Sequence, residues 1–315
     1  GHGKGCGSRG VVVISQKHQE ITAADRDRVM AASKAKVLPA DQEILHVLPR
    51  GFIVDDQDGI RDPVGMSGVR LECDVHLVTG SVTSIQNVLR SVEKAGYKAA
   101  ADGLILNALA TAEVVLNKDE KELGVALLDI GGGTTDVVIY TDSALAHTSV
   151  LPVGGNQVTA DLAMGLRTPQ AEAEELKVKY GNGMVKLVPD DDEIRVAGIG
   201  GRPAKTLKRR LVAEIIEPRM EEIFEMAAQE IRRQGFENRL SAGVVLTGGG
   251  ARMAGLVELA DRVFQLPARV GAPSGIGGLG EVVSNPAYST AVGLMMYAKE
   301  HRAPDAAGWT LAPKM

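Results

Sequence analysis

Three consecutive glycines flanked by acidic and hydroxyl side chains form the segment of this sequence best suited to chemistry. Asp129 precedes the triplet, and Thr134 and Asp136 follow it. A turn without Cβ atoms lets backbone N–H groups close around an anion, and a carboxylate ending a buried strand can hold Mg²⁺ through water beside a phosphate. The expected ligands are Asp129 for Mg²⁺ and, for phosphate, Gly131, Gly132, Gly133 and Thr134.

Two apolar, partly β-branched runs must position this turn. They lie at residues 125–128 and 137–140 and predict the strands of a hairpin. An ordinary hairpin turn needs only Asn-Gly or Asp-Gly, whereas three glycines weaken the strands that they join. The pattern therefore favours a ligand-binding turn over a purely structural one.

A second glycine triplet, at residues 248–250, follows another apolar run at 244–247. Apolar residues at helical spacing predict a helix over residues 253–264 after it, and a helix N-terminus suits the polar atoms of a nucleotide. Two triplets far apart in the chain predict one cleft with two lips. The residues expected on the second lip are Gly248, Gly249, Gly250 and Met253.

The two triplets together resemble the phosphate and adenosine motifs of the ATPase superfamily that includes actin, sugar kinases and heat-shock chaperones. Further segments, spread over nearly the whole chain, are similar to the FtsA family of actin-like bacterial cell division proteins. These segments are residues 45–49, 62–71, 75–79, 199–203, 216–219 and 288–294. The resemblance implies an α/β protein with the actin-like two-lobed ATPase fold and an FtsA-type subdomain, IC. It also implies an earlier segment with a first phosphate loop, so we expect the first lobe formed by this sequence to be incomplete.

The same resemblance implies how the chain is divided. Residues 1–80 correspond to the IC subdomain, and residues 81–123 to the remainder of subdomain IA with its hinge helix. Subdomain IIA, which binds the nucleotide, corresponds to residues 124–168 and 242–300. Subdomain IIB corresponds to residues 169–241, and residues 301–315 are expected to form a flexible tail.

Two further groups of residues are matched to roles only by the resemblance. Gly154, Gly155 and Asn156 match a short turn near the γ-phosphate. Glu174 and Lys177, which helical spacing places on one face, match contacts to ribose and adenine. The alternative for this pair is a surface ion pair of little energetic value. The implied ligands are ATP and Mg²⁺.

Hydrolysis requires a side chain that positions the attacking water. The superfamily often places Gln or Glu near the start of the hinge helix, which we expect over residues 102–116 with residues 291–293 as its partner. Counting back from Ala108 puts Gly103 at that position, and glycine has no side chain to orient water. We therefore expect no catalytic residue, firm binding of ATP as a structural clamp, and at most weak ATPase activity.

Members of the family link FtsZ filaments to the membrane, and the resemblance implies corresponding partners here. Subdomain IIB would capture the acidic and apolar tail of FtsZ, for which Arg232 and Arg233 are candidates. Other expected partners are copies of the chain in a head-to-tail polymer and later division proteins bound through IC. Family members reach the membrane through a C-terminal amphipathic helix, and residues 301–315 have too few apolar positions at helical spacing to form one. The implied location is the cytoplasmic face of the inner membrane at the division site.

Composition argues against several other classes of protein. The net charge of −5 gives no electrostatic footprint for nucleic acid, and no run of about eighteen apolar residues predicts a membrane span. Cys6 and Cys73 are too few for a disulfide scaffold and fit a reducing cytoplasm. His46 and His76 are expected to be structural rather than metal ligands. The glycine-rich residues 1–7 are expected to form a flexible or connecting segment.

Local patterns predict several further elements. Thr22 is expected to cap a helix with Asp25 at its third position. The other expected elements are turns at 49–51 and 55–59, short strands at 186–188 and 194–196 around an acidic hairpin tip at 190–193, and a helical stretch at 204–235 interrupted by Pro218.

Two alternatives remain open. A sugar kinase or polyphosphate hydrolase would share both triplets but would need a catalytic carboxylate, for which residues 11–79 offer no candidate. The other is a pilus-assembly scaffold that shares the FtsA-type IC subdomain. Residues 63–70 and 200–203 favour the FtsA family over that scaffold.

Overall fold

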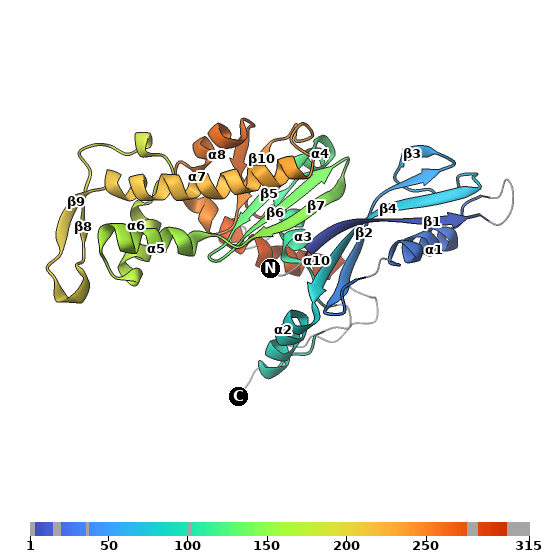
Figure 1. Cartoon of the computed structure of the whole chain (residues 1–315), viewed down its shortest axis with the longest axis horizontal. Coiled ribbons are helices and arrows are strands. Elements are labelled where there is room, and N and C mark those ends of the chain that lie inside the picture. Colours follow the sequence, from blue (N-terminus) through green and yellow to red (C-terminus); the bar gives the residue numbers. More distant parts are fainter. Residues whose placement is uncertain (1–3, 15–19, 36–37, 100–102, 276–282, 301–315) are drawn as a thin grey trace.

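The computed structural model describes residues 4–14, 20–35, 38–99, 103–275 and 283–300 (Figure 1). These residues form a four-stranded antiparallel sheet in the order β1-β4-β2-β3 and a mixed five-stranded sheet in the order β11-β10-β5-β6-β7. A β8-β9 hairpin lies at the opposite end of the molecule from the four-stranded sheet. The strands are β1 (Lys4–Val13), β2 (Gln42–Val54), β3 (Gln57–Ile60), β4 (Arg70–Ser81), β5 (Val125–Ile130), β6 (Thr135–Thr141), β7 (Ala144–Leu151), β8 (Glu193–Val196), β9 (Lys205–Lys208), β10 (Val244–Thr247) and β11 (Ala268–Val270). The helices are α1 (Ala23–Ser33), α2 (Val82–Lys94), α3 (Asn107–Val115), α4 (Lys118–Leu123), α5 (Gly155–Leu166), α6 (Gln170–Tyr180), α7 (Arg210–Arg233), α8 (Leu256–Phe264) and α10 (Ser289–Glu300).

Helix α1 packs on one face of the four-stranded sheet. The predicted cap is confirmed, because the Thr22 hydroxyl accepts from the Asp25 N–H while the Thr22 N–H donates to the Asp25 carboxylate. Val29 of this helix is fully buried in a core that includes Leu71 and Val75 of β4. Burial of Val29, with Met30 packed partly buried beside it, holds α1 against the sheet.

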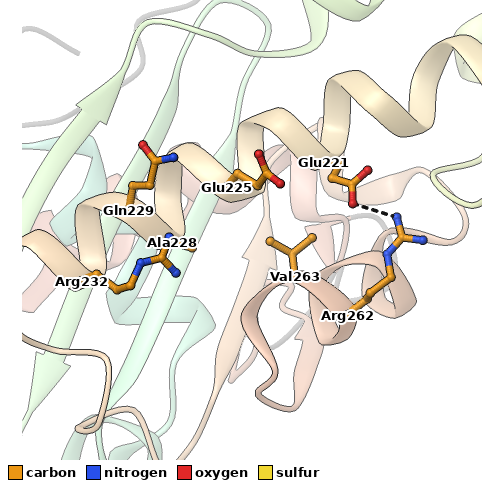
Figure 2. A pocket seen from close by; sticks show the side chains of 7 residues that line it. All are labelled: Glu221, Glu225, Ala228, Gln229, Arg232, Arg262 and Val263. Carbon is orange, nitrogen blue, oxygen red and sulfur yellow. Dashed lines mark hydrogen bonds and ion pairs between the residues drawn. The ribbon is translucent and has the colours of Figure 1, made fainter.

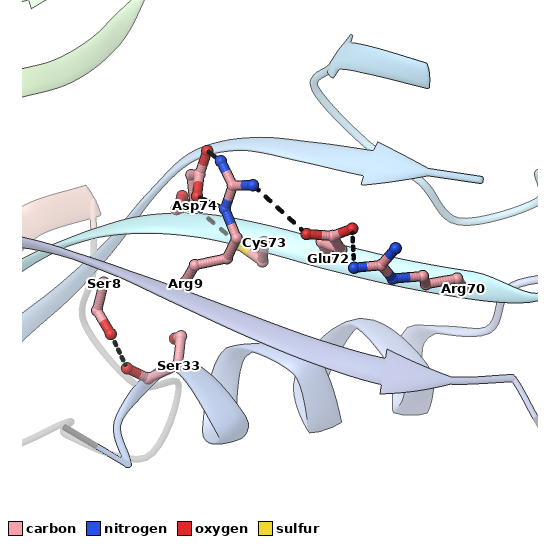
Figure 3. A network of polar contacts seen from close by, with 7 residues as sticks. All are labelled: Ser8, Arg9, Ser33, Arg70, Glu72, Cys73 and Asp74. Carbon is pink, nitrogen blue, oxygen red and sulfur yellow. Dashed lines mark hydrogen bonds and ion pairs between the residues drawn. The ribbon is translucent and has the colours of Figure 1, made fainter. Parts of the chain in front are cut away.

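An ion-pair ladder runs along β1 and β4 (Figure 3). Arg9 lies opposite Asp74 in the antiparallel register, donates to its carboxylate at 2.6 Å and lies 3.5 Å from Glu72. Arg70 pairs with Glu72 at 2.9 Å. Cys73, between the two acidic residues, is buried in the apolar core with α1. Alternation along β4 therefore separates a charged face from an apolar one.

The first strand corrects one expectation. Residues 4–7 are not a flexible segment but the beginning of β1, with Lys4 paired to Thr79 of β4, while residues 1–3 lie outside the described part of the chain. Glycine is needed here for close packing: a Cβ on Gly5 would lie 2.4 Å from His76 Nε2 and 2.5 Å from Thr148 Oγ1. Because close packing requires glycine here, this strand has the composition of a linker, which is why the sequence predicted a flexible segment.

Strand β2 corrects a second expectation. Residues 49–51 are not a turn but lie inside β2, where the register against β4 shifts between Pro49 and Gly51. Proline is tolerated in a strand at such an irregularity because no ladder hydrogen bond is required of its nitrogen there. The predicted turn at 55–59 is confirmed only for Asp55 and Asp56, which have positive φ between β2 and β3, whereas residues 57–59 lie in β3.

The five-stranded sheet contains the predicted hairpin as β5 and β6, and β10 runs parallel to β5. Alternate residues of β5 serve two apolar cores. Leu128 belongs to the core beneath α5, α7 and α8, whereas Leu127 belongs to the core beneath α3 and α10. The sheet is thus buried on both faces, and Figure 1 shows α7 crossing one of them.

The region between α6 and α7 differs from prediction in three ways. Residues Val185–Leu187 form a 3₁₀ turn rather than a strand, and β8 pairs instead with β9, within the stretch predicted to be helical. Helix α7 begins only at Arg210, and Pro218 does not interrupt it. Burial of the α7 side chains around Ile216 and Met220 outweighs the hydrogen bond that proline removes. Because β8 pairs with β9, residues 190–193 are not a hairpin tip but lead into β8, and the ion pair between Asp192 and Arg209 at 3.0 Å holds this segment near the start of α7.

The two sheets meet along β7 through buried polar contacts. His76 Nε2 of β4 lies 3.0 Å from Thr148 Oγ1, and Arg50 of β2 donates to the Ala146 carbonyl at 2.6 Å. His147, on the same strand, lies 2.9 Å from Glu230 of α7. Among the described residues, no helix is long and apolar enough to cross a bilayer.

Acidification is expected to weaken the fold through His76. Burial lowers the pKa of His76 from 6.5 to about 4, with the charges of Arg50 and His147 adding to the effect. Since the unfolded chain binds this proton more tightly, the contribution is fully present above about pH 6.5 and is lost as the pH falls toward 4. Urea titrations should show the free energy of unfolding falling by about 2 kcal/mol from pH 7 to pH 5. The variant His76→Gln should show a smaller fall, and equal falls in both proteins would contradict this assignment.

Candidate functional site

Two buried carboxylates face each other at the end of the hairpin. Asp129 of β5 and Asp136 of β6 are register partners, and each is less than a tenth exposed. Burial raises the pKa of both, and the charge of Asp129 adds to the effect on Asp136. Asp136 Oδ2 accepts a 2.5 Å hydrogen bond from the Asn107 amide, but its Oδ1 is buried without a partner within the described residues. A buried, unsatisfied carboxylate oxygen is suited to a donor or a cation.

The first glycine triplet leaves backbone donors free. Gly131 N–H bonds to the Thr134 carbonyl at 2.9 Å and closes the turn. The N–H groups of Gly132 and Gly133 form no hydrogen bond to any described residue. A Cβ on Gly133 would meet nothing within 4 Å. The turn can therefore present N–H groups to an anion, as its sequence predicts.

The predicted γ-phosphate turn lies directly against this triplet. The N–H groups of Gly155 and Asn156 donate to the carbonyls of Gly131 and Gly132 at 2.9 and 2.7 Å. A Cβ on Gly154 would lie 2.6 Å from the Gly131 carbonyl oxygen, so glycine is required for this approach. The structure thus brings the two predicted phosphate turns together.

The second triplet lies on the other side of Asp129. Gly248 has a φ of +85°, and a Cβ there would lie 2.4 Å from Asp129 Oδ1. The two triplets, far apart in sequence, therefore converge on one carboxylate. The predicted helix start is wrong, because a 3₁₀ turn (Gly250–Arg252) intervenes and α8 begins at Leu256. Met253 follows that turn and packs partly buried against the core.

Glu174 and Lys177 are more than an exposed ion pair. Lys177 Nζ lies 2.7 Å from Glu174 Oε2, and it also donates to Thr159 Oγ1 at 2.9 Å and to the Gly155 carbonyl at 3.0 Å. Both residues lie on α6, whereas Thr159 and Gly155 lie in the first turns of α5. The pair therefore attaches α6 to the turn that contacts the first triplet.

Two threonines that sequence reasoning missed connect Asp129 to helices α3 and α10. Thr111 of α3 and Thr290 of α10 each donate to Asp129 Oδ2 at 3.1 Å. The two helices cross where a Cβ on Gly293 would lie 1.9 Å from the Ala110 carbonyl oxygen. Thr111 could have been recognised as a candidate because it is a hydroxyl residue inside an alanine-rich helix. Asp129 thus joins the glycine turns to the helix crossing.

Gly103 does not lie at the start of α3, the helix expected to be the hinge. It is exposed and precedes α3, which begins at Asn107, and Asp102 lies outside the described residues. Counting back from Ala108 to Gly103 assumed that the residues between them are helical. Leu106 has extended backbone angles, so this assumption fails. The first helical side chain is the amide of Asn107, which bonds to Asp136.

Arg232 and Arg233 lie away from the glycine turns, at the end of α7. Arg233 pairs with Glu230, whereas Arg232 lines a groove between α7 and α8 and has no ion-pair partner among the described residues (Figure 2). The groove has a volume of about 420 Å³. Its lining residues are Glu221, Glu225, Ala228, Gln229, Arg232, Arg262 and Val263.

These residues fit a nucleotide with a divalent cation. The free N–H groups of Gly132 and Gly133 match phosphate oxygens, and the carboxylates of Asp129 and Asp136 match a cation. Glycine at position 248 lets the second turn lie directly against Asp129, because a Cβ there would lie 2.4 Å from Asp129 Oδ1.

Comparison of the sequence with known proteins shows which family the chain belongs to. Residues 126–293 match the family model for cell division protein FtsA, and residues 1–79 match the SHS2 domain inserted in FtsA. The chain is 48% identical to FtsA of Pseudomonas aeruginosa over 296 residues, which cover 94% of this chain and 70% of that protein. It is 43% identical to FtsA of Escherichia coli K12 over 298 residues, covering 92% of this chain and 70% of that protein.

Solved structures show the same fold at low sequence identity. The PilM–PilN type IV pilus biogenesis complex matches with a TM-score of 0.59 at 16% identity, covering 93% of this chain and 76% of that one. MreB5 of Spiroplasma citri bound to AMPPNP matches with a TM-score of 0.52 at 19% identity, covering 70% and 66%. The fold is the mixed α/β, actin-like one. The chain belongs to the FtsA family of cell division proteins.

Proposed function

We propose that this protein is an ATP-binding, actin-like adaptor of bacterial cell division that links FtsZ filaments to the inner membrane. The observation that carries the nucleotide part is the convergence of both glycine triplets on buried Asp129. ATP would supply the phosphate charge that the free N–H groups of the first turn are arranged to bind. The AMPPNP-bound MreB5 structure, which has the same fold, supports this choice of ligand.

The proposed binding residues combine the contacts described above with the roles that the family resemblance implies. Asp129 would hold Mg²⁺ through water. The phosphates would contact the turns Gly131, Gly132, Gly133, Thr134, Gly154, Gly155 and Asn156, and the nucleoside would contact Glu174, Lys177, Gly248, Gly249, Gly250 and Met253. Equilibrium dialysis with ATP and Mg²⁺ tests the proposal: about one nucleotide per chain is expected, and no retention would reject it.

ATP hydrolysis is expected to be slow. The first side chain of α3 is the neutral amide of Asn107, already bonded to Asp136, so it is a poor group for activating water. Turnover should stay below about one ATP per second, since faster rates are ordinary enzyme values. A phosphate-release assay measures this directly, and a rate of several per second would contradict the structural-clamp role.

The groove between α7 and α8 is the surface we propose for the FtsZ tail. Figure 2 shows Arg232 toward one end and the ion pair between Arg262 and Glu221 toward the other. Arg232, without an ion-pair partner in the described chain, can bind an acidic residue of the tail, and Ala228 and Val263 offer apolar contact for its other residues. Arg233 is expected to contribute less because it already pairs with Glu230.

Charge reversal at Arg232 is expected to weaken tail binding. The variant Arg232→Glu should lower affinity for a fluorescent FtsZ-tail peptide by about tenfold or more, because an attraction becomes a repulsion. Arg195→Glu, the same change at an exposed position on β8, should leave affinity unchanged. Equal affinities in Arg232→Glu and the wild type would move the tail site elsewhere.

The remaining parts of the proposal rest on family membership. The chain would form head-to-tail polymers, and the four-stranded sheet with α1 would act as the IC subdomain that binds later division proteins. Attachment to the cytoplasmic face of the inner membrane would use an amphipathic helix of the kind found at the C-terminus in this family. The proposed units are IC (1–80), the remainder of IA (81–123), IIA (124–168 and 242–300) and IIB (169–241), while the tail (301–315) lies outside the described residues.

A further inference from the structure

A histidine of the four-stranded sheet contacts the start of the hinge helix. His46 of β2 accepts a hydrogen bond at its Nε2 from the N–H of Leu106, at 3.1 Å. Leu106 is the residue that precedes α3, and no side chain in the described part of the chain caps this helix start. An acceptor from another element therefore fixes the position where α3 begins.

An irregularity in β2 places His46 at this point. The register against β4 shifts between Ile44 and His46, so Leu45 is an extra residue in the strand. Such bulges re-aim neighbouring side chains. Leu45 and Leu48 also pack against the apolar core that contains Leu106. Strand β2 therefore contacts the start of α3 through apolar packing as well as through the His46 hydrogen bond.

From Leu106 the connection continues to the candidate nucleotide site. Asn107, the next residue, donates to Asp136, the register partner of Asp129. One turn later, Thr111 donates to Asp129 itself. The first turns of α3 therefore contact His46 on the side of the four-stranded sheet and both carboxylates on the side of the glycine turns.

We propose that His46 is a positioning residue for the nucleotide cleft, which fixes the start of α3 and so the placement of Asn107 against Asp136. The inference rests on the proposed nucleotide site and adds a residue of the four-stranded sheet to it. By reciprocity, if the contact between His46 and Leu106 strengthens nucleotide binding, bound nucleotide strengthens that contact by the same free energy.

Three variants test the proposal in binding titrations with ATP and Mg²⁺. His46→Leu removes the acceptor and should weaken ATP binding about three- to tenfold, the range of one neutral hydrogen bond. His46→Gln keeps an acceptor oxygen at similar reach and should restore most of that loss. His76→Leu removes a buried histidine of the same sheet that contacts Thr148 instead of α3, and it should leave ATP affinity unchanged.

A spectroscopic measurement on the wild type covers the case in which His46→Leu does not fold. The imidazole ¹⁵N resonances of His46 should shift when ATP and Mg²⁺ are added, whereas those of His76 should not. Wild-type affinity in His46→Leu, equal losses in His46→Leu and His46→Gln, or an unmoved His46 resonance with nucleotide bound would each overturn the inference alone. A wild-type chain that binds no nucleotide would instead reject the proposed function, and the inference with it.

Discussion

Replacing Asp129 by asparagine is expected to weaken Mg²⁺-dependent ATP binding by about a hundredfold, or ~3 kcal/mol, without loss of fold stability. The charge that would hold the hydrated cation is removed. The amide oxygen can still accept from Thr111 and Thr290, so the link between α3 and α10 survives. Because burial raises the pKa of Asp129, its ionised form is disfavoured in the folded chain, and a neutral amide relieves that cost.

Titrations with a fluorescent ATP analogue, paired with urea unfolding, check both halves of this prediction. Asp119→Asn is the matched control, since Asp119 is an exposed carboxylate in the first turn of α4. Its ATP affinity should equal that of the wild type. Unchanged ATP affinity in Asp129→Asn would contradict a role for Asp129 in binding Mg²⁺. A large loss of stability would show that the negative charge of Asp129 is needed to hold α3 and α10 together.

Replacing Gly293 by alanine is expected to destabilise the protein by about 2–4 kcal/mol, although alanine favours helix by about 1 kcal/mol. The added Cβ would lie 1.9 Å from the Ala110 carbonyl oxygen and 3.1 Å from the Thr111 nitrogen. Backbone cannot yield as a flexible side chain can, so α10 must move away from α3. That movement also separates Thr290 from Asp129, and ATP affinity should fall with stability.

Another helical glycine provides the control for Gly293. A Cβ on Gly165 of α5 would meet the end of the Ile215 side chain at 2.7 Å, which can rotate aside. Gly165→Ala should therefore change the free energy of unfolding by less than about 1 kcal/mol. Urea denaturation of both variants gives the comparison, and similar stabilities for the two would contradict the close helix crossing.

Local patterns predicted the parts of the fold that depend on neighbouring residues. The hairpin around Gly131, Gly132 and Gly133, the Thr22 cap and the β5 strand each follow from short-range spacing and are present in the structure. The glycine triplets indicated the site because segments whose backbones pack closely together require glycine, and glycine can be recognised directly in the sequence. Two such triplets, each following an apolar strand, then predicted one cleft with two lips.

Long-range contacts account for what the sequence could not predict. Thr111 and Thr290 meet at 2.9 Å although 179 residues separate them, and neither belongs to a local motif. The start of α3 depends on His46, 60 residues earlier, so counting back along the helix misplaced Gly103. Gly5 resembled a linker residue because its reason for being glycine, the contact with His76, lies on another strand.

The most direct test of the account is a structure of this chain determined with AMPPNP and Mg²⁺. The phosphates should lie within hydrogen-bond distance of the Gly132 and Gly133 N–H groups, with hydrated Mg²⁺ beside Asp129 and the nucleoside along residues 248–250. A nucleotide bound elsewhere, or a cleft in which Asp129 contacts neither metal nor its water, would contradict the central claim.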